Sequence, residues 1–176
     1  MKNEVSKIRP FRVGLISLGC AKNLVDAEIM LGSLLKGGVE ITNDAAQADA
    51  VIVNTCSFID SAQEESVDTI LESVELRDAS QRGQAVIVSG CLSQRFREEL
   101  PKLMPEVDAF MGIDQVAQVG DIVGKAIASR AAKTQSGQRP AESGRRMADS
   151  LAEVFTCFLC VASLSTTADV YHFSSP

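Results

Sequence analysis

The sequence predicts an α/β fold in which an open, mostly parallel sheet carries helices on both faces. Three short apolar runs rich in Val and Ile have the length of strands, and a helix-like stretch follows each one. Strands that alternate with helices indicate parallel pairing, because each crossover helix packs back onto the sheet. The three runs are residues 11–18, 50–54 and 85–89, and the alternating pattern extends over residues 11–128.

The first run is followed by a predicted amphipathic helix. Asn23 can cap this helix, Asp26 lies in the favourable first turn, and the pair Gly37-Gly38 ends it. Residues 39–42 then have the length and composition of a short strand. The apolar residues of the helix repeat at helical spacing and are Ala27, Met30, Leu31, Leu34 and Leu35.

The second run leads into another predicted helix. Ser61 with Glu64 three residues later forms a capping box, which marks the start of a helix. One apolar stripe at i, i+3, i+4 and i+7 follows and indicates the face that packs on the sheet. The stripe consists of Val67, Ile70, Leu71 and Val74.

The third run precedes the last expected elements of the domain. A shorter helix is expected over residues 93–100, and Pro101 is expected to end it. Residues 109–112 are predicted as a last strand and residues 116–128 as a last helix. Each of these segments continues the βα alternation, so together they predict one domain over residues 11–128.

The rest of the chain has a different composition. Residues 1–10 form a polar N-terminal extension. Residues 129–150 are rich in Arg, Gln, Ser, Gly and Ala, with five basic and two acidic side chains, and are expected to be a solvated linker. Residues 151–176 begin with an apolar run and then lose any pattern. We expect an irregular, unassigned and poorly ordered tail there.

Composition excludes several classes of protein. The chain has 176 residues, 45% of them apolar, and a net charge of −6. The net charge gives neither a nucleic-acid footprint nor a polybasic membrane anchor. The N-terminus lacks a secretory signal, and no run reaches the roughly 18 apolar residues of a membrane span. We therefore expect a cytoplasmic protein, in which five cysteines indicate metal or redox chemistry rather than disulfides.

Three of these cysteines occupy equivalent places in the predicted fold. Cys20, Cys56 and Cys91 each lie just beyond a predicted strand, and glycine precedes the first and the third. The carboxyl ends of parallel strands share one edge of the sheet, where ligands of such folds bind. We therefore expect the three thiols to converge on one metal or cluster site. The alternative is three unrelated buried thiols, since free cysteine is often a small apolar filler.

The spacing of the cysteines favours an iron–sulfur cluster over zinc. Structural zinc sites usually have four ligands, typically in close C-x-x-C pairs. Here the separations are 36 and 35 residues, and the sole histidine is His172, near the C-terminus. A cubane cluster held by three protein thiolates keeps one iron open for an external ligand.

Three ordered motifs resemble the N-terminal domain of the methylthiotransferases. They are SLGCAKNLVDAE at residues 17–28, NTCSFIDSA at residues 54–62 and SGCLSQR at residues 89–95. These radical-S-adenosylmethionine enzymes insert a methylthio group into an unactivated C–H bond. The resemblance implies that Cys20, Cys56 and Cys91 ligate the auxiliary 4Fe-4S cluster, the one implicated in carrying or donating sulfur. The residues after Cys20 resemble the RimO branch, which modifies an aspartate of a small-subunit ribosomal protein.

The resemblance covers only part of such an enzyme. The family continues into a radical-SAM barrel, which holds S-adenosylmethionine and a second 4Fe-4S cluster on a C-x-x-x-C-x-x-C motif, and then into a small C-terminal barrel. Cys157 and Cys160 form a C-x-x-C, but Glu153 stands where the first cysteine of that motif would be. We expect the chain to bind a cluster and to be inactive alone, as a truncated remnant or with its catalytic half on another chain. From about residue 145 the sequence matches nothing in the family and has the character of a foreign end.

Three other functions are alternatives. One is a non-enzymatic flavodoxin-like binding module with buried cysteines, although no Gly-rich phosphate loop follows any strand. Another is a fragment of the tRNA-modifying MiaB branch, which usually has Gln-Met-Asn after the first cysteine. The third is a zinc protein that uses Cys157 and Cys160.

Overall fold

The computed structural model describes residues 9–80 and 83–135. These residues contain a five-stranded sheet in which every pair of neighbouring strands is parallel. The predicted α/β class with a parallel sheet is therefore confirmed. The expected tail at residues 151–176, with Cys157 and Cys160, lies outside the described residues.

The strands are arranged in the order β2-β1-β3-β4-β5. This is the flavodoxin-like order, in which the connections reverse direction between β1 and β3 and open a crevice at their carboxyl ends. The bounds are β1 Arg12–Ser17, β2 Glu40–Ile41, β3 Ala50–Thr55, β4 Ala85–Gly90 and β5 Ala109–Phe110. The expected strands at residues 39–42 and 109–112 are present in shortened form.

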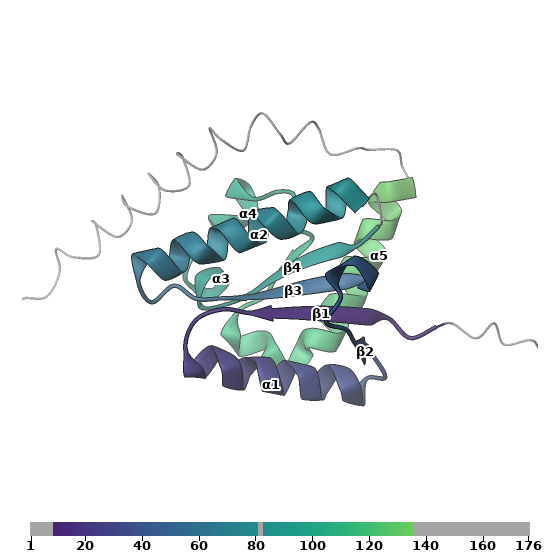
Figure 1. Ribbon diagram of the computed structural model, residues 1–176, viewed down its shortest axis with the longest axis horizontal. Helices are drawn as coiled ribbons and strands as arrows, with labels where there is room; N and C mark the ends of the chain where they lie inside the picture. The colour runs from purple at the N-terminus through teal and green to yellow at the C-terminus, as the bar shows by residue number, and fades with distance from the viewer. Residues whose placement is uncertain (1–8, 81–82, 136–176) are drawn as a thin grey trace, which may run out of the picture. The chain divides into compact units, whose positions relative to one another are not determined.

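Helices cover both faces of the sheet (Figure 1), as the sequence predicted. The helices α1 and α5 lie on one face, and α2 lies on the other. Two 3-10 helices, η1 and η2, connect strands to later elements. The bounds are α1 Ala21–Lys36, η1 Ala45–Gln47, α2 Asp60–Ser80, α3 Cys91–Arg95, α4 Leu100–Leu103, η2 Ile113–Gln118 and α5 Val119–Gln135.

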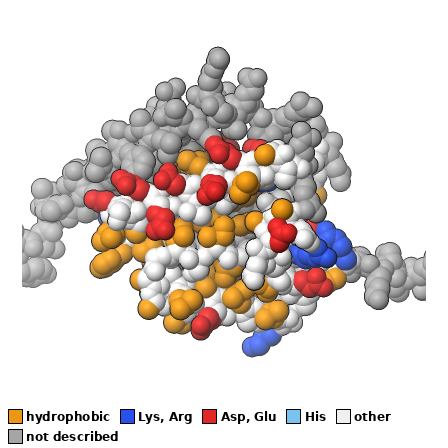
Figure 2. Space-filling view, viewed as in Figure 1, with side chains coloured by type: hydrophobic (Ala, Val, Ile, Leu, Met, Phe, Trp, Pro, Cys, Tyr) orange, Lys and Arg blue, Asp and Glu red, His pale blue; other side chains and the backbone are white. Residues whose placement is uncertain are grey.

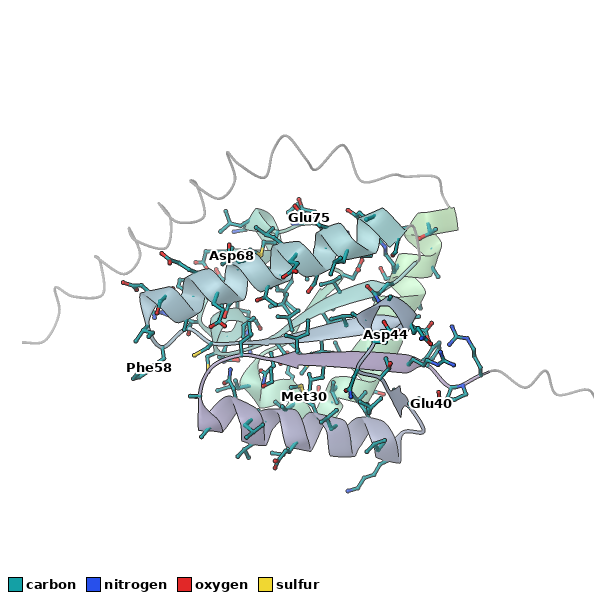
Figure 3. The ribbon with its side chains drawn as sticks, in the orientation of Figure 1. Met30, Glu40, Asp44, Phe58, Asp68 and Glu75 are labelled. Carbon is teal, nitrogen blue, oxygen red and sulfur yellow. The ribbon has the colours of Figure 1, made fainter. Side chains whose placement is uncertain are left out.

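The core follows the period-two alternation of the strands. Ile52 and Ile87 belong to the cluster between the sheet and the pair α1–α5, and Met30 reaches this cluster from α1 (Figure 3). Successive strand residues point to opposite faces, so Val51 and Val53 face α2. Every residue of β3 and β4 is buried, which agrees with continuous apolar runs in strands covered on both faces.

Two predicted helix starts are wrong. Asn23 does not cap α1. The N-cap residue is Cys20, and Asn23 lies buried inside the first turn. Ser61 does not cap α2, because that helix begins at Asp60 and the N–H of Gln63 already bonds to the carbonyl of Ile59 at 3.1 Å. In both cases the polar residue that looked like a cap lies inside the helix.

The segment around Pro101 also differs from the prediction. Instead of one helix over residues 93–100, the chain forms α3 and then α4, with a break at Phe96, whose φ is −114° and ψ is 42°. Pro101 lies in the first turn of α4, where its missing N–H is not needed, so it starts a helix rather than ending one.

The last helix is longer than predicted. The 3-10 helix η2 precedes it, and α5 continues to Gln135, so residues 129–135 of the expected linker are helical. Within residues 9–80 and 83–135, no helix combines the length and apolar content that crossing a membrane requires.

Candidate functional site

Three neighbouring strands deliver the three cysteines to one edge of the sheet. Cys20 follows β1 and precedes α1, Cys56 follows β3 directly, and Cys91 is the first residue of α3 after β4. The strands β1, β3 and β4 are adjacent, so all three thiols lie at the carboxyl edge, beside the crevice between β1 and β3. All three are free thiols. Cys20 is exposed, Cys91 is half-buried and Cys56 is buried.

The loop of Cys20 contacts Cys56, and Cys91 senses the charge of both other thiols. A Cβ atom built on Gly19 would lie 2.8 Å from the Sγ atom of Cys56, so the loop of Cys20 passes directly over Cys56. Burial raises the pKa of Cys91, Lys22 opposes this rise, and the charges of Cys56 and Cys20 add to it. Cys91 therefore lies within electrostatic reach of both other thiols.

The surroundings of Cys20 lower the pKa of its thiol, whereas those of Cys91 raise it. The backbone N–H groups of Asn23 and Lys22, at the start of α1, lower the pKa of the Cys20 thiol. Helix N-termini favour thiolates because their N–H groups are unpaired and the helix dipole is positive there. Cys20 therefore forms its thiolate, the form that acts as a nucleophile or a metal ligand, more readily than Cys91 does.

Lys22 is a cation beside the thiols. Its ammonium group lies 2.7 Å from Asp26 Oδ2, and this hydrogen bond is the main cause of its raised pKa. The charges of Cys91 and Cys20 raise the pKa of Lys22 further. Negative charge on the thiols therefore has a cation close by to offset it.

Two asparagines join the cysteine loops. The Nδ2 atom of Asn23 donates to Leu18 O at 2.9 Å and to Thr55 O at 2.8 Å, so it bridges the ends of β1 and β3. Asn54 Nδ2 donates to the backbone oxygen of Asn23 at 2.8 Å. Both side chains are fully buried.

Ser66 is a site residue that the sequence analysis missed. Its hydroxyl oxygen accepts from the N–H of Cys56 at 3.0 Å and lies 3.0 Å from the carbonyl oxygen of the same residue. It also lies 2.7 Å from Ala62 O within α2. A signal was available, since Ser66 is a polar residue next to Val67 on the face of α2 that packs on the sheet.

Gly90 allows the end of β3 and the start of α3 to lie close to each other. Its φ is +100°, and a Cβ atom there would lie 2.4 Å from Thr55 O. A side chain would therefore clash with backbone as well as strain the φ angle. Thr55 Oγ1 also donates to Ser89 O at 2.5 Å, which ties the last residues of β3 and β4 together just before their cysteines.

Three thiols on separate loops form the donor set of this edge. Within residues 9–80 and 83–135, no group of three or more His, Cys, Asp or Glu side chains is placed to hold one metal ion. Thiolates on a cubane bind different irons, so they stand farther apart than ligands around one ion. Three thiols on separate loops, with N–H groups and Lys22 to offset their charge, suit such a polynuclear group.

Exposed apolar side chains flank the sheet edge that carries Cys20, Cys56 and Cys91, which we call the cysteine edge. Leu24 and Val25 follow Cys20 in α1, and Phe58 and Ile59 follow Cys56 in the loop before α2. Phe58 is 86% exposed and projects outward from this loop (Figure 3). Acidic side chains line the outer face of α2 (Figure 2), among them Asp68 and Glu75, which Figure 3 labels.

Comparison with known proteins agrees with these observations. Residues 12–112 match the family model described as "Uncharacterized protein family UPF0004". The ribosomal protein uS12 methylthiotransferase RimO of Akkermansia muciniphila is 55% identical over 116 residues, which is 65% of this chain and 26% of that protein. The RimO protein of Symbiobacterium thermophilum is 48% identical over 122 residues, covering 69% of this chain and 25% of that protein.

The chain spans about a quarter of the length of the curated relatives that it matches. The matched region begins with β1 and continues past β5, so it contains the whole sheet and all three cysteines. The resemblance seen in the three motifs is thereby confirmed. The chain belongs to the UPF0004 family, the N-terminal domain of the RimO-type methylthiotransferases.

Proposed function

We propose that this chain is an auxiliary-cluster domain in which Cys20, Cys56 and Cys91 hold a 4Fe-4S cluster. One observation carries the proposal: three adjacent parallel strands end in these cysteines at one edge of the sheet. The electrostatic coupling of Cys91 to the other two thiols supports it. When bound, the cluster supplies an open iron site at which sulfur is carried.

Several residues of the chain have different roles in holding the cluster. Cys20, whose pKa is lowered by the N-terminus of α1, supplies a thiolate that forms more readily than that of an ordinary cysteine. Cys56 is held in place by Ser66 and by the overlying backbone of Gly19. Lys22 offsets negative charge at the edge, as a cation does beside any group of thiolates.

We further propose that this domain serves a RimO-like radical-SAM methylthiotransferase acting on an aspartate of ribosomal protein uS12. The names of the relatives support this substrate over the tRNA substrate of the MiaB branch. S-adenosylmethionine and a second cluster belong to the part of the relatives that this chain does not cover. For this domain itself, the proposed role is cluster binding.

Anaerobic reconstitution tests the cluster. The wild-type chain is loaded with iron and sulfide, desalted and assayed, and we expect about four of each per chain. Serine variants of Cys20, Cys56 or Cys91 should lose most of the iron and the visible absorbance of the cluster. The double variant Cys157→Ser/Cys160→Ser is the matched control and should keep both. Near-zero iron in the wild type, or unchanged iron in Cys56→Ser, would contradict the proposal.

A further inference from the structure

Every polar group of Asn23, in its side chain and its backbone, interacts with a residue at the cysteine edge. Its side-chain nitrogen donates to Leu18 O at 2.9 Å and to Thr55 O at 2.8 Å. Its side-chain oxygen lies 3.6 Å from Cys91 Sγ, which donates to it. Its backbone oxygen accepts from Asn54. Its backbone N–H is the main cause of the lowered pKa of Cys20.

The two carbonyl acceptors determine the orientation of the Asn23 amide. Only the NH₂ group can donate, so it must face Leu18 and Thr55, and the oxygen is left facing Cys91. Leu18 lies two positions before Cys20, and Thr55 directly precedes Cys56. One buried side chain is therefore bonded to the backbone beside two of the cysteines and to the sulfur of the third.

We infer that Asn23 is the positioning residue that sets the mutual geometry of Cys20, Cys56 and Cys91. The inference rests on the proposed function, because it assumes that the three thiols act as one ligand set. The hydrogen bonds from the Asn23 amide to Leu18 O and Thr55 O hold the cysteine loops in place. These two bonds do not involve Cys91, so they persist when Cys91 loses its proton on binding a metal.

No other side chain of similar size can replace this asparagine. Aspartate has the same shape but no donors, so the buried carbonyl of Thr55 and the partly buried carbonyl of Leu18 would lose this partner, and a carboxylate would face Cys91. Leucine fills a similar volume and makes none of the bonds. Glutamine keeps the amide but is one methylene longer in a site with no exposed surface.

A second buried amide provides the matched control. Gln84 Nε2 donates to Ala45 O at 2.6 Å and to Ala48 O at 3.0 Å, and the residue is 7% exposed. It precedes β4, at the opposite end of that strand from Cys91. Gln84→Met thus removes an equivalent pair of hydrogen bonds, one buried and one partly buried, far from the thiols.

The test measures thiol proximity in the chain without a cluster. In full-length chains carrying Cys157→Ser/Cys160→Ser, dibromobimane becomes fluorescent only when it bridges two neighbouring thiols. Peptide mass spectrometry then identifies the bridged pair. We expect Asn23→Leu and Asn23→Asp to reduce bridging among the three cysteines about tenfold, and to reduce iron uptake in parallel. Gln84→Met should keep both values at the wild-type level. Urea unfolding of each variant should show similar stability losses for Asn23→Leu and Gln84→Met.

Two results would overturn the inference: wild-type bridging in Asn23→Leu, or an equal loss of bridging in Gln84→Met. The outcome is separable from that of the cluster proposal. If the parent chain takes up no iron but Asn23→Leu still loses bridging, the cluster proposal fails and the positioning role of Asn23 stands. If the parent chain binds iron and Asn23→Leu binds it equally well, the positioning role fails alone.

Discussion

The backbone of Gly19 lies so close to Cys56 that a Cβ atom at position 19 would be 2.4 Å from the Cβ atom of Cys56. The φ of Gly19 is +92°, a conformation that side chains disfavour. We predict that Gly19→Ala destabilises the fold by about 1–3 kcal/mol and displaces Cys56. Urea unfolding and iron content after reconstitution would measure the two effects.

Gly32 provides the control for this variant. A Cβ atom at Gly32 meets nothing within 4 Å, and the residue lies inside α1. Gly32→Ala should therefore stabilise the chain by up to about 1 kcal/mol through helix propensity and leave iron binding unchanged. Equal iron content in the two alanine variants would argue against a role for the Gly19–Cys56 contact.

Ser66 should contribute to stability through Cys56. In Ser66→Ala, the buried N–H of Cys56 loses its acceptor, and we expect a loss of about 1–3 kcal/mol in the free energy of unfolding. Ser73→Ala is the matched control, because the hydroxyl of Ser73 donates to Thr69 O in the same helix and should matter less. Denaturant midpoints of the two variants, measured in parallel, decide the question, and equal midpoints would remove Ser66 from the site.

The thiols should differ in the pH at which they react. Alkylation by iodoacetamide requires the thiolate, so a lowered pKa moves the rate profile of Cys20 to lower pH. Burial moves the profile of Cys91 to higher pH. Peptide mass spectrometry after timed alkylation of the cluster-free chain measures both profiles. In the urea-unfolded chain the two profiles should coincide, and faster labelling of Cys91 than of Cys20 near neutral pH would contradict the assignment.

The end of the sheet opposite the cysteines holds a buried ion pair. The side chains of Arg77 and Asp108 are both 0% exposed and lie 3.3 Å apart, and Arg77 also donates to Glu106 O at 2.9 Å. We predict that Arg77→Leu destabilises the domain by about 3–5 kcal/mol, because Asp108 remains buried with weaker pairing. Thermal and urea unfolding would measure the loss.

Two further variants make this prediction specific. Arg77→Leu/Asp108→Leu should recover part of the stability, since the carboxylate of Asp108 is then no longer buried without Arg77. Arg97→Leu breaks an exposed pair with Asp114 and should change stability by about 0–1 kcal/mol. An equally small effect of Arg77→Leu would show that Arg130 and Lys133, which also lie near Asp108, suffice to neutralise it.

Local sequence patterns predicted which strands and helices form better than they predicted where each helix begins. The runs that became β3 and β4 are continuously buried, so an apolar run was a sufficient signal for them. The run that became β1 is buried only in part, at Val13 and Gly14. Caps are different, because Asn and Ser can bond many partners. The capping rule misassigned Asn23 and Ser61. It also could not reveal that Asn23 bonds to Leu18 and Thr55, residues brought to it by the packing of two strands.

The sequence by itself determined the α/β class, the succession of parallel strands and the placement of Cys20, Cys56 and Cys91 just beyond three of them. These features depend on periodicity and composition within a few residues of each position. Tertiary structure decided which strands are neighbours, and therefore that the three thiols share one edge. It also decided that Ser66 and Gly19 hold Cys56. Such contacts join residues that are distant along the chain, and their energies depend on burial and geometry that exist only after the sheet has formed.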